Sequence, residues 1–138
     1  MQKLIIGFTG TRQGMSKGQK QKLRDTLREL KASNKNGMCE FHHGDCLGAD
    51  EEAHEIANEE GYWVVAHPPS DPKARAFVIA HCERPKKPYL VRDHDIVDEC
   101  QILIAAPKSN TEVMRSGTWA TIRYGLKKER QIIMLGRN

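Results

Sequence analysis

Carboxylates and histidines are concentrated in one short segment of the chain, HHGDCLGAD at residues 42–50. Asp45 and Asp50 are candidate catalytic residues, because carboxylates in such a segment can bind ribose hydroxyls or transfer protons. The alternative is that both carboxylates cap the start of a helix. The same segment contains three candidate ligand-binding residues, His43, Gly44 and Gly48.

The adjacent histidines of this segment suggest a metal site. Successive residues of a strand point to opposite faces of a sheet, so at most one of His42 and His43 can face a common site. No third ligand stands at a recognisable spacing from them. The sequence therefore predicts neither a metal ion nor a cofactor.

Two further segments contain residue types that bind phosphate. The turn GTR at residues 10–12 combines a tight backbone, a hydroxyl and an arginine, which can grip phosphate with two donors. The segment RSGT at residues 115–118 precedes a predicted helix, whose first turn offers free N–H groups and a field that favours anions. A plain turn and a helix cap are the alternatives. The phosphate-binding candidates are Gly10, Thr11, Arg12, Arg115, Ser116, Gly117 and Thr118.

A predicted helix over residues 89–99 contributes Tyr89, Arg92 and Asp95 to the candidate site. Arg92 and Asp95 are three residues apart, so they are neighbours on the helix, and an exposed ion pair is the alternative interpretation. In the functional interpretation Arg92 binds phosphate or a departing base, and Asp95 orients Arg92. His67 ends a predicted strand, and Trp119 either packs in the core or stacks on a base.

These residues need elements that bring them together, and the order of elements predicts an α/β fold. Short apolar runs predict strands at residues 3–8, 38–42, 62–66, 101–105 and 130–135. Predicted helices cover residues 17–32, 49–60, 89–99 and 117–128, whereas residues 68–88 contain five of the six prolines and are predicted to be irregular. This alternation predicts a three-layer Rossmann-like fold, with one domain over residues 1–138 and a mostly parallel five-stranded sheet in the order 3-2-1-4-5. Ligands of such sheets bind at the carboxyl ends of the strands, where the candidate segments converge.

Charge is distributed unevenly along a chain of 138 residues with a net charge of +4. Residues 1–35 contain nine Lys or Arg and two acids, whereas residues 36–66 contain eight acids and no Lys or Arg. A basic helix beside an acidic one explains this, and a basic face for a partner is the alternative.

No apolar run suits a signal peptide or a membrane span, and the four cysteines form no CxxC pair, so we expect a cytoplasmic protein with reduced thiols.

Three motifs together resemble the SLOG superfamily, which includes the DNA-processing proteins Smf/DprA and the lonely-guy phosphoribohydrolases. The motifs are GFTGTR at residues 7–12, FHHGDCLGAD at 41–50 and RSGTWAT at 115–121. The resemblance covers nearly the whole chain and is strongest to small members common in bacteria and their phages. It implies a Rossmann-like sheet that binds a nucleotide or a nucleotide-derived small molecule, and it implies a homo-oligomer.

The resemblance to the lonely-guy enzymes extends to their phosphate-binding motif, Gly-Gly-x-Gly-Thr-x-x-Glu, which also supplies a catalytic glutamate. Gly117 and Thr118 match the Gly-Thr of this motif, and Arg92 is similar to an arginine on a helix of those enzymes. The glutamate position falls on Thr121, and Arg115 replaces part of the first Gly-Gly. The resemblance therefore supports a phosphate site and puts the hydrolase chemistry in doubt.

Three functional hypotheses follow. The first is hydrolysis of the N-glycosidic bond of a nucleoside 5′-monophosphate or a related nucleotide, with Asp45 or Asp50 at the ribose and Arg92 with Asp95 assisting base departure. The second is a nucleotide sensor or sponge without turnover, which the missing glutamate favours. The third is single-stranded DNA binding, which the DprA resemblance and the basic residues 17–35 favour but the low aromatic content, 6%, does not.

Overall fold

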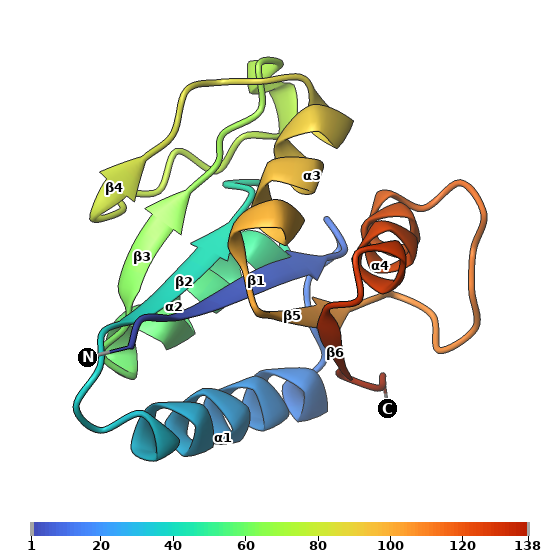
Figure 1. Cartoon of the computed structure of the whole chain (residues 1–138). Helices are drawn as coiled ribbons and strands as arrows, with labels where there is room; N and C mark the ends of the chain where they lie inside the picture. The colour runs from blue at the N-terminus through green and yellow to red at the C-terminus, as the bar shows by residue number, and fades with distance from the viewer. Residues whose placement is uncertain (1, 138) are drawn as a thin grey trace.

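A parallel β-sheet lies at the centre of the computed structural model, which describes residues 2–137 of the chain (Figure 1). The strands are β1 (Leu4–Gly10), β2 (Cys39–His43), β3 (Trp63–Ala66), β4 (Cys82–Glu83), β5 (Ile102–Ala106) and β6 (Gln131–Met134). The helices are α1 (Lys17–Ser33), α2 (Ala49–Glu59), α3 (Tyr89–Glu99) and α4 (Gly117–Lys127), and η1 (Pro72–Ala74) is one turn of 3-10 helix.

The strand order is β4-β3-β2-β1-β5-β6, and all five neighbouring pairs are parallel. The predicted α/β class is confirmed, and the five predicted strands stand in the predicted order. The predicted number of strands was wrong, because β4 adds a sixth strand at the β3 edge. It lies within residues 68–88 and contains two residues, which is too short for a periodic apolar pattern to reveal.

Two helices cover each face of the sheet, as Figure 1 shows. Helices α1 and α2 pack on one face, where Leu23 and Leu27 of α1 are fully buried with Phe8 and Phe41 of the sheet. Helices α3 and α4 pack on the other face, over a smaller apolar cluster around Val97. The four cysteines are free, and no helix within residues 2–137 is both long and apolar enough to cross a membrane.

Helix α1 begins after Ser16 because a reciprocal capping pair forms there. The Ser16 hydroxyl accepts from the backbone N–H of Gln19 at 3.1 Å, and the Gln19 side-chain oxygen accepts from the backbone N–H of Ser16 at 3.0 Å. The buried Gln19 amide also donates to the carbonyl oxygens of Pro107 and Leu135, both at 3.0 Å. One side chain thus joins the start of α1 to the segments that follow β5 and β6.

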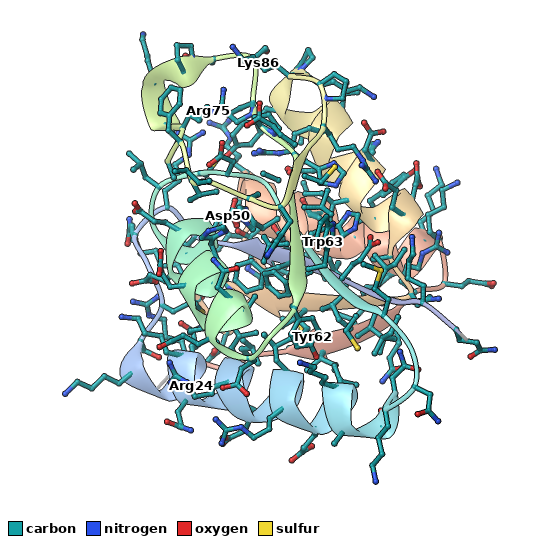
Figure 2. All side chains as sticks on the ribbon, turned by 90° about the vertical axis from the view of Figure 1, so that its left-hand side faces the viewer. Arg24, Asp50, Tyr62, Trp63, Arg75 and Lys86 are labelled. Atoms are coloured by element: carbon teal, nitrogen blue, oxygen red, sulfur yellow. The ribbon has the colours of Figure 1, made fainter. Side chains whose placement is uncertain are left out.

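The basic and acidic segments of the sequence face each other in the structure. Three ion pairs join α1 to α2 and its end: Lys20–Glu52 at 3.1 Å, Arg24–Glu59 at 3.2 Å and Arg28–Glu60 at 2.8 Å. Figure 2 shows Arg24 on α1, where α1 runs below α2. The expectation of a basic helix beside an acidic one is confirmed, and much of the charge on α1 is balanced within the chain.

Candidate functional site

A polar cavity of about 300 Å³ lies at the carboxyl ends of β1 and β2, beside the first turns of α3 and α4. Parallel strands end at the same edge of the sheet, and β1 lies between β2 and β5 at the switch of strand order, where ligands bind in this class of sheet. The predicted site residues that line the cavity are Gly10, Thr11, Arg12, Gly44, Asp50, Tyr89, Arg92, Ser116, Gly117 and Thr118.

The guanidinium of Arg92 forms the buried wall of this cavity. Its Nε donates to Asp93 at 2.5 Å, its Nη1 donates to the carbonyl oxygens of Gly44 and of His67, and its Nη2 donates to the Cys46 sulfur at 3.4 Å. A Cβ on Gly44 would come within 2.5 Å of Arg92 Nη1, so only glycine allows this close approach. Because four of its five N–H donors are used on protein acceptors, Arg92 positions its neighbours and does not offer the two free donors of a phosphate clamp.

Two carboxylates share the positive charge of Arg92. Burial raises the pKa of Asp50 to about 7, although the nearby Arg92 opposes this shift, and Asp93 adds to it. Burial also raises the pKa of Asp93, again against the effect of Arg92. Burial opposes the charge of Arg92, but Asp93 and Asp50 outweigh it and raise the pKa of the guanidinium. A carboxyl that titrates near neutrality, 7% exposed in a cavity, can accept and return a proton.

The opposite side of the cavity can bind an anion. The Arg12 side chain is exposed, and within residues 2–137 its guanidinium has no hydrogen-bond or ion-pair partner. Its Cζ lies 5.0 Å from the centre of the Tyr89 ring, and Arg92 lies at the same distance from that ring. The Tyr89 ring thus contacts both arginines of the cavity, the exposed Arg12 and the buried Arg92.

The first turn of α4 supplies the other donors. Ser116 is the N-cap residue, and its hydroxyl accepts from the Trp119 backbone N–H at 3.3 Å. Capping therefore occurs as the alternative interpretation proposed, and it leaves Gly117 and Thr118 at the start of the helix, lining the cavity. The N–H groups of a first helical turn have no intrahelical acceptor and attract anions.

The fold has relatives among the solved structures, although the sequence matches no family. No family model matches the sequence, and no curated protein is significantly similar to it. The molybdenum cofactor binding protein from Rippkaea orientalis superposes with a TM-score of 0.73 at 18% identity, covering 100% of this chain and 79% of that one. The molybdenum cofactor carrier protein from Chlamydomonas reinhardtii gives 0.64 at 22% identity, over 96% of this chain and 76% of that one.

DNA processing protein A (DprA) from Streptococcus pneumoniae superposes with a TM-score of 0.66 at 17% identity. The alignment covers 95% of this chain and 50% of DprA, so this chain spans about half of that protein. The chain has the Rossmann-like fold that it shares with these proteins. At these identities the comparisons establish the fold alone, and the chemistry of the site must be argued from its own residues.

Asp45 does not line the cavity. Its carboxylate accepts from Arg75 Nε at 2.7 Å and from the Val78 backbone N–H at 3.0 Å, and the Asp45 side chain is fully buried. Figure 2 shows Arg75 on the segment above the sheet and Asp50 in the interior near the start of α2. Asp45 therefore holds the segment of residues 68–88 against the β2 loop.

The two predicted histidines also lie outside the cavity. His43 is fully buried, faces His54 of α2 at 3.1 Å and accepts from the Asp45 backbone N–H at 2.9 Å. Burial holds the pKa of His43 well below its usual value, which keeps the ring neutral. His67 points away from the cavity toward His42, on the other face of the sheet from His43, and only its carbonyl oxygen contacts Arg92.

Four other predicted residues also lie outside the cavity lining. Asp95 pairs with Lys87 at 2.6 Å, and both side chains are partly exposed. Gly48 precedes α2 with φ of +90°, and a Cβ there would meet the Arg12 backbone at 2.2 Å, so its role is in the backbone. Arg115 is exposed, and Trp119 lies in an apolar groove beside Ile122 and Leu126. In the described part of the chain the buried Trp119 Nε1 has no hydrogen-bond partner.

Asp93 and Cys46 are the two lining residues with reactive side chains that the sequence reasoning missed. The buried face of α3 consists of Arg92, Asp93, Ile96 and Val97. Counted from Arg92, the other three follow at one, four and five residues. Counting back from the apolar pair Ile96 and Val97 by one helical turn gives Arg92 and Asp93 as the inward pair. That spacing was the available signal, and the choice of Asp95 followed the wrong neighbour of Arg92. The other unpredicted lining residues are Phe8, Thr9 and Gln13.

Proposed function

We propose that the cavity binds a phosphorylated nucleotide or nucleotide-derived ligand and hydrolyses its N-glycosidic bond, with Asp50 as the proton-transferring group. The observation that carries this proposal is that one cavity holds both a proton-transferring carboxyl and a set of anion-binding donors. A carboxyl with a pKa of about 7 lies on the floor, and a free arginine with a helix N-terminus lies at the rim. A nucleotide presents a matching pair, a dianionic phosphate and a bond whose cleavage needs a proton.

The phosphate would lie at the first turn of α4, within reach of Arg12. The backbone N–H groups of Gly117 and Thr118, the Thr118 hydroxyl and the Arg12 guanidinium are donors of the type that bind phosphate oxygens. Arg92 does not need a negatively charged ligand group to balance its charge, because Asp93 and Asp50 already do so. The sugar and base would then extend toward Asp50.

The chemistry of the step places demands on the carboxylates. The bond between the anomeric carbon and the base nitrogen breaks, a water oxygen bonds to that carbon, and the proton released by water ends on the base. Positive charge develops on the sugar as the base leaves, and ionised carboxylate stabilises it. Asp93 is paired with Arg92 at 2.5 Å, and this cation favours its ionised form against the effect of burial, whereas Asp50, with a pKa of about 7, is suited to carry the proton.

A second function, ligand binding without turnover, is favoured by Thr121. Its buried hydroxyl lies 2.9 Å from Gly117 O and 3.3 Å from Asp93 Oδ2, and its one proton is shared between these two acceptors, at the position where the lonely-guy motif has its glutamate. A threonine at this position can hold Asp93 in place but cannot act as an acid or a base. The fold neighbours from Rippkaea and Chlamydomonas are named for binding or carrying a cofactor, which is a function of this second kind.

Single-stranded DNA binding is the third function and receives less support. The DprA neighbour is named for DNA processing, but the basic residues of α1 that favoured this hypothesis are paired with α2. Arg12 and the α4 turn form a local corner of the surface, and phosphate contacts along a strand would require a longer basic track.

One experiment separates these functions. Stoichiometric protein is incubated with nucleoside monophosphates, NAD, ADP-ribose, cyclic nucleotides and a short single-stranded oligonucleotide, then passed through a size filter, and the filtrate is analysed by chromatography. We expect one nucleotide to be depleted and its free base to appear. Arg12→Ala should restore the nucleotide to the filtrate. The control is Arg24→Ala, because Arg24 lies in α1 and does not line the cavity, and this variant should behave as the wild type.

The other outcomes have definite meanings. A nucleotide that is retained and reappears intact after denaturation supports binding without turnover and removes the hydrolase. Retention of the oligonucleotide alone would support the DNA-binding function. A pool that passes through unchanged would contradict the proposal.

A further inference from the structure

A second polar cluster lies away from the cavity, between the ends of β2 and β3 and the last turn of α3. His42 Nδ1 lies 2.8 Å from His67 Nε2, and the Glu99 carboxylate oxygens lie 3.9 Å from His42 Nδ1 and 3.8 Å from His67 Nε2. Among residues 2–137, this is the group of three potential ligands whose donor atoms all lie within 4.8 Å of one another.

The hydrogen bonds around the cluster fix which nitrogen of His42 faces inward. Glu40 accepts from His42 Nε2 at 2.8 Å, and Lys3 holds the other Glu40 oxygen at 3.0 Å. The proton of His42 therefore lies on Nε2, and the lone pair of Nδ1 points at His67. A carboxylate that binds the outer N–H of an imidazole is the usual second partner of a metal-binding histidine.

Both imidazole rings of the cluster are buried. His42 is fully buried and His67 is 2% exposed. Since the His42 proton lies on Nε2, the proton between the two rings belongs to His67 Nε2. A metal ion could take the place of that proton if the His67 proton moves to Nδ1, the outer nitrogen of its ring.

We propose that His42 Nδ1, His67 Nε2 and a carboxylate oxygen of Glu99 bind one divalent transition-metal ion, with Zn²⁺ as the ion whose preferences they fit. Ligand atoms about 2.0–2.1 Å from a tetrahedral Zn²⁺ stand about 3.3 Å apart. The observed separations, from 2.8 to 3.9 Å, bracket that value, so changes of about half an ångström in each separation would complete the site. The Glu99 side chain is 33% exposed, which leaves a path to water for a fourth ligand.

The charges that face the cluster are compatible with a cation. Glu99 and Glu40 supply two negative charges, and Lys3 and Arg84 supply positive ones at the outer side of each carboxylate. Arg84 Nη2 binds Glu99 Oε1 at 2.6 Å, but Arg84 Nε is 3.4 Å from Oε2. Oε2 is thus the less engaged oxygen, and it is the one nearest His67 Nε2.

The ion would connect the end of β3 with the last turn of α3. The carbonyl oxygen of His67 accepts from Arg92 Nη1 at 3.1 Å, so the same residue contributes to the wall of the nucleotide cavity. The sequence-based expectation of no metal rested on spacing alone. The ligands come from three elements, at positions 42, 67 and 99, which no local spacing can reveal.

The test is a metal titration of the 138-residue chain without an affinity tag. Protein freed of metal by chelation is titrated with Zn²⁺ by calorimetry and with Co²⁺ by visible absorption. We expect one ion per chain and Co²⁺ bands of a tetrahedral nitrogen–oxygen site without a thiolate charge-transfer band. Glu99→Gln, at a partly exposed position, should weaken Zn²⁺ binding at least tenfold, and His67→Gln should weaken it further.

The matched control is His94→Gln, since His94 is an exposed histidine of α3 that stacks on Tyr124. It should bind Zn²⁺ as the wild type does. Equal affinity of the wild type and Glu99→Gln, or a thiolate band that disappears on mutation of Cys82, would overturn the proposal. Glu99→Gln alone decides the matter if His67→Gln does not fold.

Discussion

Asp45 and Asp50 stand five residues apart, in the loop after β2 and in the first turn of α2, and have opposite environments. Asp45 is neutralised by Arg75 at 2.7 Å and by a backbone N–H at 3.0 Å, and it has no access to the cavity. Asp50 accepts from the Cys46 backbone N–H at 3.3 Å, shares Arg92 with Asp93, and borders open space. A carboxylate with its own cation fastens two segments together, and a carboxylate that competes for a shared cation remains able to bind a proton.

The largest effect is expected at Asp50. Asp50→Asn removes the group that carries the proton, so turnover of the retained nucleotide should fall by about 10²–10⁴-fold while binding persists. Single-turnover release of free base, measured beside nucleotide retention, checks this. Asp45→Asn, which keeps the shape of the other carboxylate, should leave turnover per folded molecule close to that of the wild type. Equal losses in the two variants would remove the distinction between them.

Asp45 should matter more for stability. Asp45→Ala leaves Arg75, whose side chain is 8% exposed, with the partly exposed Glu83 as its remaining ion-pair partner. Removing one partner of a buried ion pair costs about 3–5 kcal/mol when the other charge is left unpaired, so with Glu83 still in place the free energy of unfolding should fall by about 3 kcal/mol in urea denaturation. The residue also has φ of +53°, which alanine tolerates poorly and asparagine accepts, so Asp45→Asn should lose less. A loss below about 1 kcal/mol would show that the pair does not hold this loop.

The two arginines near the rim of the cavity provide the next contrast. Arg12 lines the cavity, and Arg115 is exposed outside its lining. A charge-assisted hydrogen bond contributes about 1.5–3 kcal/mol, so Arg12→Ala should weaken nucleotide binding by roughly 10–100-fold. Arg115→Ala should change the affinity by less than about threefold, as for an exposed charge. Calorimetric titration of the two variants measures both, and the reverse ranking would favour the assignment made from the sequence motif.

The smallest effect is a pH dependence that comes from Asp50. Its pKa in the folded chain, about 7, lies above that of an unfolded aspartate, so protonation favours the folded state. This stabilisation is complete below about pH 4 and is lost as the pH rises through 7. Asp50→Asn lacks this dependence. Its free energy of unfolding relative to the wild type should therefore rise between pH 5 and 8, on the order of 2 kcal/mol.

Urea denaturation of both proteins across this pH range measures the difference. The histidines with lowered pKa values are present in both proteins, so their contributions cancel. A difference that stays constant from pH 5 to 8 would contradict a raised pKa at Asp50.

The sequence predicted the fold and the location of the cavity better than the roles of single carboxylates. Apolar runs alternate with amphipathic helices, and the carboxyl ends of parallel strands meet, so Arg12, Asp50 and Gly117 were placed together correctly. The partner of Asp45 stands thirty residues further on, in a segment without periodicity. The partners of His42 come from β3 and α3. Such long-range contacts depend on how the loops pack, and residue spacing does not encode that.

A crystal structure of the chain with the nucleotide that it retains would show directly which carboxylate faces the sugar. We expect the phosphate at the first turn of α4, within hydrogen-bond distance of Gly117 N and the Arg12 guanidinium, with the anomeric carbon facing Asp50. Asp45 should still bind Arg75 in that structure. A nucleotide bound elsewhere on the molecule, or one whose sugar contacts Asp45 instead of Asp50, would rule out Asp50 as the proton-transferring group.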